Sequence, residues 1–365
     1  MTESTENIAA VIMAGGIGTR FWPISTEEKP KQFCNLFDDR TLLQKSFDRL
    51  AQTIPPDRIL VLTNERYVDV VKQQLPDIPL QNIIGEPLRR NTAAAVCLGA
   101  QLLQNRFGNP VIITVTADHI IEPHDVFIKT MLSAASQACD TDLLYTFAIN
   151  PTYPATGYGY IEIGNKVADD KGIPHYNVLS FKEKPDTHTA GTYINTGRHF
   201  WNSGMFVWSS RAILKAIETY LPQHHTSIAK AVEYDRTPQW QPMLTQAFES
   251  LQPISIDYAV IEKSQNVRCV TCDFSWKDVG GWQALGEFLT ADRNGNQYSG
   301  NVYISDSKNS IIYSEDKSEI LVLAGVEDMI VVRAGDKTLI MHKEYAEKIK
   351  DIIESIETDT LKSDT

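Results

Sequence analysis

The first part of the chain, up to about residue 150, alternates short apolar runs with stretches in which apolar residues recur at helical spacing. The runs predict strands at 9–13, 58–63, 83–85, 111–116 and 143–149, and the stretches predict helices at 41–51, 64–75, 92–107 and 124–138. Strands that alternate with helices are typical of a mainly parallel, doubly wound sheet. Ligands of such sheets bind beyond the carboxyl ends of the strands.

The pattern becomes less regular from about residue 150 to 290. Hairpin-like pieces at 159–163, 178–184 and 204–208, with helices at 210–220 and 227–233, predict an insertion in the same sheet. The polar, turn-rich segment 291–296 predicts a boundary, so we expect one domain at 1–290 and a second at 297–365.

The second domain has a different pattern. Its short β-like runs lie at 302–304, 310–313, 320–323, 329–332 and 338–341, and a charged helix is expected at 343–356. Runs that recur about every ten residues are typical of a small β-solenoid or a sandwich.

Composition narrows the class of protein. The chain has 365 residues and a formal net charge of −12, which disfavours nucleic acids and anionic membranes as partners. No apolar run is long enough to span a membrane, and the acidic start does not resemble a signal peptide. The scattered cysteines indicate a reducing cytoplasm, because Cys269 and Cys272 lie on a predicted strand whose spacing points them to opposite faces.

The most specific motif is a glycine turn after the first strand, Gly15-Gly16-Ile17-Gly18-Thr19-Arg20, with Lys31 shortly after it. Glycine lets backbone N–H groups approach a ligand with no Cβ in the way, and successive N–H groups bind anions. Arg20 and Lys31 add positive charge. No Lys-Ser or Lys-Thr pair follows, which excludes a P-loop, and Phe21 stands where a dinucleotide fingerprint needs glycine. The turn predicts a phosphate cradle in a nucleotide enzyme.

Two aspartates are candidate metal ligands. Asp118 follows the strand at 111–116, level with the glycine turn, and Asp278 follows another strand and precedes glycines. Magnesium prefers carboxylate oxygen and keeps several waters, so the two aspartates would suffice if they converge. The alternative for Asp118 is that it caps the next helix.

Further candidates lie in the less regular segment. Lys184 could neutralise a phosphate while Glu183 accepts hydrogen bonds from hydroxyl groups, although a solvated, charged strand end is the alternative. Asn202 offers both a donor and an acceptor. Gly159 would let the backbone approach a ligand.

A third set points to the nucleobase. The carboxylate of Glu86 matches the paired N1–H and N2–H donors of guanine, which uracil and thymine lack. Asn91 and Thr92 follow it, and either could instead cap the helix at 92–107.

Together these motifs resemble the sugar nucleotidyltransferases, and among them the short bacterial mannose-1-phosphate guanylyltransferases. The resemblance spans nearly the whole chain and rests on the glycine turn, Lys29-Pro30-Lys31-Gln32-Phe33, Glu86, Arg90-Asn91-Thr92-Ala93, Ala117-Asp118-His119, Gly157-Tyr158-Gly159-Tyr160, Glu183-Lys184-Pro185, Trp201-Asn202-Ser203-Gly204-Met205-Phe206, Ser255-Ile256-Asp257-Tyr258-Ala259-Val260 and Trp276-Lys277-Asp278-Val279-Gly280. One local departure is Ala94, where the family usually has proline.

The resemblance implies an α/β fold with a Rossmann-like, doubly wound mixed sheet of the GT-A-like nucleotidyltransferase type. It also implies a small β-rich C-terminal domain, for which a left-handed β-helix is one candidate. The family joins GTP to α-D-mannose 1-phosphate with Mg²⁺, giving GDP-mannose and pyrophosphate. Longer members carry a cupin-type isomerase domain, so isomerase activity is not expected here.

The resemblance also assigns roles to residues: Arg20, Lys31 and Lys184 to phosphate charge; Gly15, Gly16, Gly18, Thr19, Glu86, Asn91 and Thr92 to the nucleotide; Gly159, Glu183, Asn202 and Asp257 to the sugar; Asp118 and Asp278 to Mg²⁺. Two alternatives stay open. The chain could act on another sugar 1-phosphate, such as a heptose, or be a catalytically silent regulatory subunit that binds a GDP-sugar. A homodimer is the expected assembly.

Overall fold

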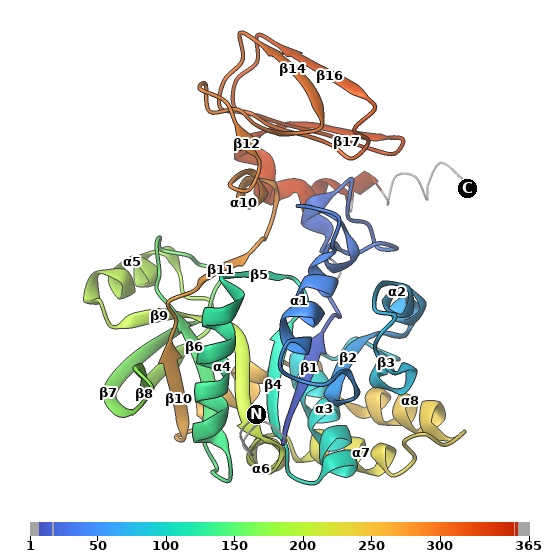
Figure 1. Cartoon of the computed structure of the whole chain (residues 1–365), viewed down its shortest axis with the longest axis vertical. Helices are drawn as coiled ribbons and strands as arrows, with labels where there is room; N and C mark the ends of the chain where they lie inside the picture. The colour runs from blue at the N-terminus through green and yellow to red at the C-terminus, as the bar shows by residue number, and fades with distance from the viewer. Residues whose placement is uncertain (1–6, 17, 354, 357–365) are drawn as a thin grey trace. The chain divides into compact units, whose positions relative to one another are not determined.

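The computed structural model describes residues 7–16, 18–353 and 355–356 (Figure 1). The chain divides into two compact units. Unit 1 comprises Met1–Gly15 and Gln44–Lys277, and unit 2 comprises Gly16–Leu43 and Asp278–Thr365. Most of the glycine turn therefore groups with the C-terminal segment of the chain.

Unit 1 is built on a mixed sheet whose strand order is β3-β2-β1-β4-β9-β6-β10-β8-β7 in the described part of the chain. Its strands are β1 (Ile8–Met13), β2 (Ile59–Asn64), β3 (Ile83–Glu86), β4 (Val111–Thr116), β6 (Leu144–Ile149), β7 (Tyr160–Asp170), β8 (Ile173–Lys182), β9 (His199–Ser209) and β10 (Val267–Thr271). A short separate sheet pairs β5 (His119–Glu122) with β11 (Ser275–Asp278).

Strand direction changes at β9. The strands β3, β2, β1 and β4 run parallel, as the sequence predicts. β9 is antiparallel to both β4 and β6, and the long hairpin β7–β8 is antiparallel to its neighbours. The mixed sheet that the resemblance implies is thus confirmed. Parallel pairing, as the sequence predicts, holds for β3-β2-β1-β4 and again between β6 and β10.

Helices cover both faces of this sheet. They are α1 (Leu42–Ala51), α2 (Val68–Gln74), α3 (Asn91–Phe107), α4 (His124–Ala138), α5 (Thr187–Thr196), α6 (Ser210–Tyr220), α7 (Pro222–Val232), α8 (Trp240–Ser250) and α9 (Ile256–Ala259). Ala9 and Val11 of β1 belong to the core cluster beside α3, whereas Ala10 and Ile12, equally buried, point to the opposite face. Burial on both faces explains why β1 is apolar throughout.

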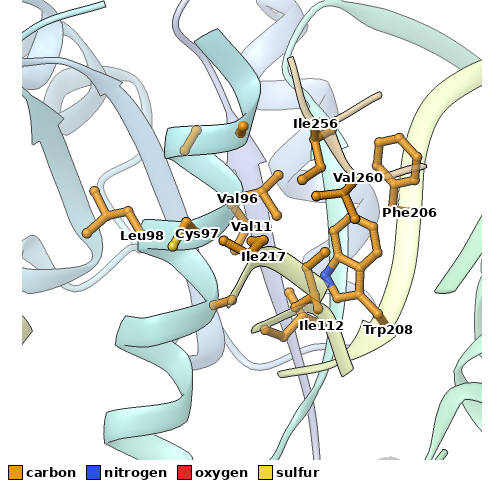
Figure 2. Packing of buried hydrophobic residues seen from close by; sticks show 14 of the residues in the cluster. Val11, Val96, Cys97, Leu98, Ile112, Phe206, Trp208, Ile217, Ile256 and Val260 are labelled. Carbon is orange, nitrogen blue, oxygen red and sulfur yellow. The ribbon is translucent and has the colours of Figure 1, made fainter. Parts of the chain in front are cut away.

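The main core lies between the sheet and the helices α3, α6, α7 and α9. Figure 2 shows Val11 and Ile112, from β1 and β4, packed near Val96 of α3. Trp208 of β9 is fully buried in the same cluster, and Val260 follows α9. This packing fixes the strand ends, which carry the candidate site residues.

Unit 2 contains a β-solenoid. One sheet consists of β12 (Thr290–Ala291), β13 (Gln297–Ser299), β15 (Ile311–Ser314), β17 (Met329–Ala334) and β18 (Lys337–His342), and the other of β14 (Asn301–Ser305) and β16 (Ile320–Ala324). Asn301 pairs in parallel with Ile320, and Ile311 with Ile330, so a coil takes 19 residues at these positions, whereas Gln297 pairs with Ile311 only 14 residues later. Two strands per coil explain the spacing seen in the sequence, and the solenoid, not the sandwich, is the observed form.

The rest of unit 2 is helical or irregular. A short helix, α10 (Trp282–Gly286), precedes the solenoid, and the segment after it begins as the 3-10 helix η8 (Lys343–Lys348) and continues as α-helix. None of the helices that the structure describes is both long enough and apolar enough to cross a membrane. The five cysteines are free thiols.

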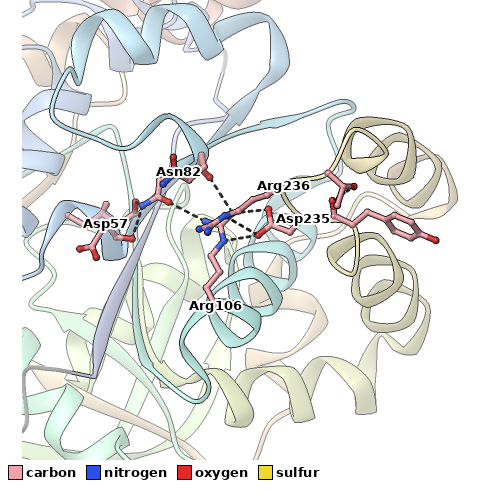
Figure 3. Close-up of polar contacts among 9 residues, drawn as sticks. Asp57, Asn82, Arg106, Asp235 and Arg236 are labelled. Atoms are coloured by element: carbon pink, nitrogen blue, oxygen red, sulfur yellow. Dashed lines mark hydrogen bonds and ion pairs between the residues drawn. The ribbon is translucent and has the colours of Figure 1, made fainter.

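A buried ion pair ties together three connections of unit 1 (Figure 3). Arg106 of α3 donates from Nε and Nη2 to both carboxylate oxygens of Asp235, at 2.8 and 2.9 Å. Its Nη1 donates to Asn82 Oδ1 at 3.1 Å, and Asn82 in turn donates to the main-chain oxygens of Pro56, Asp57 and Ile59. The Arg106 and Asp235 side chains are only 6% and 7% exposed.

We expect Asp235→Ala to lower the free energy of unfolding by about 3–5 kcal/mol, because it leaves the buried guanidinium of Arg106 without its counter-charge. The matched control is Asp69→Ala, which removes the exposed pair of Asp69 with Lys72 and should cost about 0.5 kcal/mol or less. Urea unfolding followed by circular dichroism measures both. Equal, small losses for the two variants would show that the buried pair is not a structural tie.

Candidate functional site

Glu86 is the last residue of β3, and its carboxyl group lies close to Gly15. A Cβ built on Gly15 would stand 3.6 Å from Glu86 Oε2, so the carboxyl group faces the bare backbone of that glycine. Burial raises the pKa of Glu86 to about 8. The structure thus brings two of the predicted nucleotide-binding residues of unit 1 together and leaves the carboxyl group poorly solvated.

Asn91 and Thr92 begin α3, but they use their side chains differently. Asn91 has a left-handed backbone (φ 63°), which asparagine tolerates, and its Oδ1 accepts a hydrogen bond from the backbone N–H of Thr92 at 2.8 Å. The hydroxyl of Thr92 accepts from the backbone N–H of Ile256 at 2.9 Å. Thr92 therefore links α3 to α9, and Asn91 is the exposed one of the pair.

Asp118 lies in the turn between β4 and β5, so it does not cap a helix, and that alternative is wrong. Its side chain is 35% exposed, and its Oδ1 lies 3.9 Å from His119 Nε2. Nδ1 of His119 lies 2.7 Å from Thr116 Oγ1 and accepts a hydrogen bond from Trp276 Nε1 at 3.1 Å, so both side chains hold the imidazole in place. The rings of Trp276 and Tyr158 meet edge to face next to this group.

The four predicted sugar-binding residues come together in unit 1, and we call them the carboxylate cluster: Gly159, Glu183, Asn202 and Asp257. Asn202 donates from its backbone N–H to the Gly159 oxygen at 2.8 Å and from Nδ2 to Asp257 Oδ1 at 2.9 Å. A Cβ on Gly159 would lie 2.5 Å from Glu183 Oε2, so any other residue here would displace that carboxylate.

Charge in the carboxylate cluster is predominantly negative. Burial, together with the neighbouring charge of Glu183, raises the pKa of Asp257 to about 7, while Lys184 acts in the opposite direction. Lys184 Nζ lies 3.3 Å from Glu183 Oε1; the lysine is 59% exposed and the glutamate only 10%. The side chain of Glu183 is therefore not the solvated strand end that the alternative describes, whereas that of Lys184 reaches water.

Sequence reasoning missed Thr146, which lies next to this cluster. Its Oγ1 donates to Asn202 Oδ1 at 2.7 Å from β6, where it is fully buried. The Thr146 hydroxyl in a largely apolar strand was a signal in the sequence, but the local pattern does not show which residue it hydrogen-bonds.

In unit 2, the glycine turn packs against Lys31. Gly18 has φ 59°, and a Cβ there would lie 2.6 Å from Lys31 Cβ, so both conformation and space require glycine. Gln32 Nε2 donates to the Gly16 oxygen at 2.9 Å, and Ser25 donates to the Gly18 oxygen. These contacts hold the turn in one shape.

Lys31 is buried, and its ammonium group contacts the end of β11 and the residue after it. Its Nζ donates to the Val279 oxygen at 2.8 Å and lies 3.3 Å from Asp278 Oδ1. Lys31 is 6% exposed and Asp278 32%. The structure thus brings together a predicted phosphate-binding cation and a predicted metal ligand as an ion pair.

Arg20 lies in the 3-10 helix η2 (Thr19–Phe21) and is exposed. A Cβ on Gly280 would lie 3.5 Å from Arg20 Nη1, so the guanidinium sits over bare backbone beside Asp278 and Val279. Next to it, Trp282 donates from Nε1 to the Trp22 oxygen at 3.0 Å.

A divalent cation would find part-exposed carboxylates in these residues. Asp118 and Asp278 each keep about a third of the side chain exposed, which suits an ion that retains waters. Within residues 7–16, 18–353 and 355–356, no three or more His, Cys, Asp or Glu side chains group closely enough to hold a metal ion.

Comparison with known families covers both parts of the chain. The nucleotidyl transferase family model matches residues 9–295, and the model of the MannoseP isomerase/GMP-like beta-helix domain matches residues 300–356. The second match agrees with the 19-residue coils of unit 2.

Individual relatives agree. A mannose-1-phosphate guanylyltransferase of Escherichia coli is 37% identical over 347 residues, which are 94% of this chain and 73% of that protein. The enzyme of the same name from Sinorhizobium fredii is 34% identical over 356 residues, 96% of this chain and 68% of that protein.

Solved structures show the same likeness. A Thermus thermophilus protein named mannose-1-phosphate geranyltransferase is 30% identical with a TM-score of 0.85, covering 96% of this chain and 99% of that chain. The alignment and the family matches together assign the sequence: the chain belongs to the nucleotidyl transferases and, among them, to the family of the mannose-1-phosphate guanylyltransferases.

Proposed function

We propose that this protein transfers GMP from GTP to α-D-mannose 1-phosphate, giving GDP-mannose and pyrophosphate. The relatives' names give the reaction, and one structural observation supports the nucleotide choice: an acceptor group, the carboxyl of Glu86, faces the bare backbone of Gly15, which we propose as part of the nucleotide site. Guanine presents two adjacent N–H donors that a carboxylate matches. Asn91, exposed at the start of α3, is the second proposed contact to the nucleotide.

For the triphosphate, we propose the backbone N–H groups of Gly15, Gly16, Gly18 and Thr19 and the cations Arg20 and Lys31. Arg20 is exposed and can reach a ligand, whereas Lys31 is held by Val279 and Asp278. Lys31 therefore fixes the shape of the turn as well as supplying charge. Positive charge here offsets the charge that develops on the departing pyrophosphate.

For the sugar phosphate, we propose Lys184 at the phosphate and the carboxylate cluster at the ring hydroxyls. Glu183 and Asp257 are acceptors when ionised, and Asn202 holds Asp257 in place. Mannose offers hydroxyl donors that such acceptors bind.

The bound divalent cation, which we propose to be Mg²⁺ with Asp118 and Asp278 as carboxylate ligands, would neutralise phosphate charge. An oxygen of the sugar phosphate attacks the α-phosphorus of GTP; the new P–O bond forms as the bond to the β-phosphate breaks, and pyrophosphate leaves on the opposite side. Because this nucleophile is already anionic, it needs no general base. The protein's contribution is to bring two mutually repelling anions together and to orient them.

We propose the cytoplasm as the site of action and a homodimer as the assembly. GTP and sugar 1-phosphates are cytoplasmic metabolites, and the thiols of the five cysteines are free.

The decisive assay is pyrophosphate release with GTP, Mg²⁺ and a panel of sugar 1-phosphates. We expect release with mannose 1-phosphate, much less with its epimers and with heptose 1-phosphate, and none when the cation is chelated. Preference for another sugar would favour the heptose-type alternative. No release with any sugar, together with tight GDP-mannose binding, would favour the silent regulatory subunit.

We expect the affinity for GTP to rise with pH through the pKa of Glu86, which burial raises to about 8. The free protein carries a hydrogen on this carboxyl group below that pH, and guanine binds the ionised form, so affinity grows by up to about ten-fold per pH unit and levels off above. Calorimetric titration of wild type and Glu86→Gln measures the effect.

The variant Glu86→Gln, which has an amide in place of the carboxyl group, should bind GTP about ten-fold more weakly. It should also lose this part of the pH dependence. The exposed Glu262→Gln serves as the control and should leave both unchanged. Identical slopes in wild type and Glu86→Gln would contradict the assignment of Glu86 to guanine.

We expect Arg20→Ala to lower kcat/KM by about 10²–10³-fold, because it removes a charge that acts on the phosphates in the transition state. Since Arg20 is exposed, the melting temperature should stay within about 2 °C. The control, Arg293→Ala, removes another exposed arginine of unit 2 and should leave the kinetics unchanged. Near-normal turnover of Arg20→Ala would sink the cradle assignment.

A further inference from the structure

We propose that Thr146 is a positioning residue for sugar-phosphate recognition: its hydroxyl fixes the orientation of the Asn202 amide, which in turn presents a donor to Asp257. This inference rests on the proposed function of the carboxylate cluster and adds a residue to it. The chain of contacts is short. Thr146 Oγ1 donates to Asn202 Oδ1 at 2.7 Å, and Asn202 Nδ2 donates to Asp257 Oδ1 at 2.9 Å.

The two ends of an asparagine amide have the same shape and opposite hydrogen-bonding roles. An ionised Asp257 can only accept, so the NH₂ end of Asn202 must face it. That leaves the amide oxygen facing Thr146, where it needs a donor because Asn202 is only 7% exposed. The Thr146 hydroxyl has one hydrogen and two acceptors within reach, Asn202 Oδ1 at 2.7 Å and the Met205 oxygen at 3.2 Å. Donated to the nearer acceptor, this hydrogen satisfies the amide oxygen, so Thr146 selects the amide orientation that Asp257 requires.

Burial makes this orientation consequential. Thr146 is 0% exposed, so water cannot replace its hydroxyl if it is removed. Asp257 has a negative neighbour, Glu183, whose charge opposes its ionisation, while the charge of Lys184 favours it. Hydrogen bonds from the backbone N–H of Asp257 and from the Asn202 amide also favour its ionised form, so losing the orientation of the amide should raise the pKa of Asp257.

The neighbouring strand supplies a matched control. Phe206 of β9 pairs with Thr146 of β6 on one side and with Thr114 of β4 on the other. Both threonines are buried at 1% exposure or less, in the same row of one sheet. Replacing each with valine makes the same change of shape and polarity, but only Thr146 contacts Asn202.

The experiment compares Thr146→Val, Thr146→Ser and Thr114→Val with wild type. For Thr146→Val we expect KM for mannose 1-phosphate to rise about ten-fold with KM for GTP unchanged. Its kcat/KM for the sugar phosphate should also reach its plateau at a higher pH than in wild type, where burial and Glu183 raise the pKa of Asp257 to about 7. Thr146→Ser keeps the hydroxyl and should restore both, and Thr114→Val should match wild type.

Equal effects of Thr146→Val and Thr114→Val, or equal changes in both KM values, would show a merely structural role and overturn the proposal. A second readout does not depend on activity: carbon-13 NMR of aspartate carboxyl groups, with Asp257→Asn to identify the resonance. The pKa of Asp257 should move upward in Thr146→Val and stay in place in Thr114→Val. If wild type releases no pyrophosphate, the proposed function fails, yet this titration still decides the role of Thr146.

Discussion

The site residues of unit 1 depend on one constraint: carboxyl groups are held where water cannot fully solvate their charge. Glu86 and Asp257 both have a raised pKa, and burial is the main cause in each case. Such groups oppose folding in their ionised form, since the unfolded chain solvates them better. A fold keeps them only if something else stabilises the surrounding strands, which here is the core between the sheet and α3.

Unit 2 holds its buried charge in the opposite way. Lys31 is deeply buried but has both a carboxylate, Asp278, and a main-chain oxygen, that of Val279, within reach. Pairing removes much of the cost of burial, and the lysine then sets the path of the backbone around Gly18. In unit 1 the carboxyl groups are only partly neutralised, so a ligand with hydrogen-bond donors can stabilise their charge. In unit 2 the charge of Lys31 is paired, and the pair fixes the path of the backbone.

Much of the fold follows from the sequence, because its core strands are apolar on both faces and its first helices are strongly periodic. β4 and α4 have the predicted bounds, and β1 and α3 differ by one residue. The helices α5 and α8 escaped prediction because polar residues interrupt their periodicity, as in Thr187–Thr196. The position of β9 between β4 and β6 could not be predicted either, since it depends on long-range packing and not on local pattern.

The candidate site, too, could be predicted only in part from the sequence. The motifs that carry the family resemblance were enough to select Gly159, Glu183, Asn202 and Asp257, which the fold brings together from four separate segments. It could not show that the Asn202 amide is already bonded at both ends, because those partners come from β6 and α9. The Asn202 amide, which was predicted to be a direct ligand of the sugar, therefore also forms hydrogen bonds within the protein.

In the glycine turn, the contacts that fix the shape and the side chain that carries the charge are different. Phe21 and Trp282 meet edge to face at 5.4 Å, Trp282 also contacts Tyr313 of β15, and the Tyr313 hydroxyl donates to the Asn35 oxygen at 3.2 Å. Within unit 2, strand β15 of the solenoid therefore supports the segment that carries Arg20. This support leaves the turn accessible to a ligand, because Arg20 stays exposed while the aromatic rings are buried. The solenoid is thus a scaffold for the glycine turn, which we propose to bind phosphate, and removing the solenoid should disturb this turn before it disturbs the sheet of unit 1.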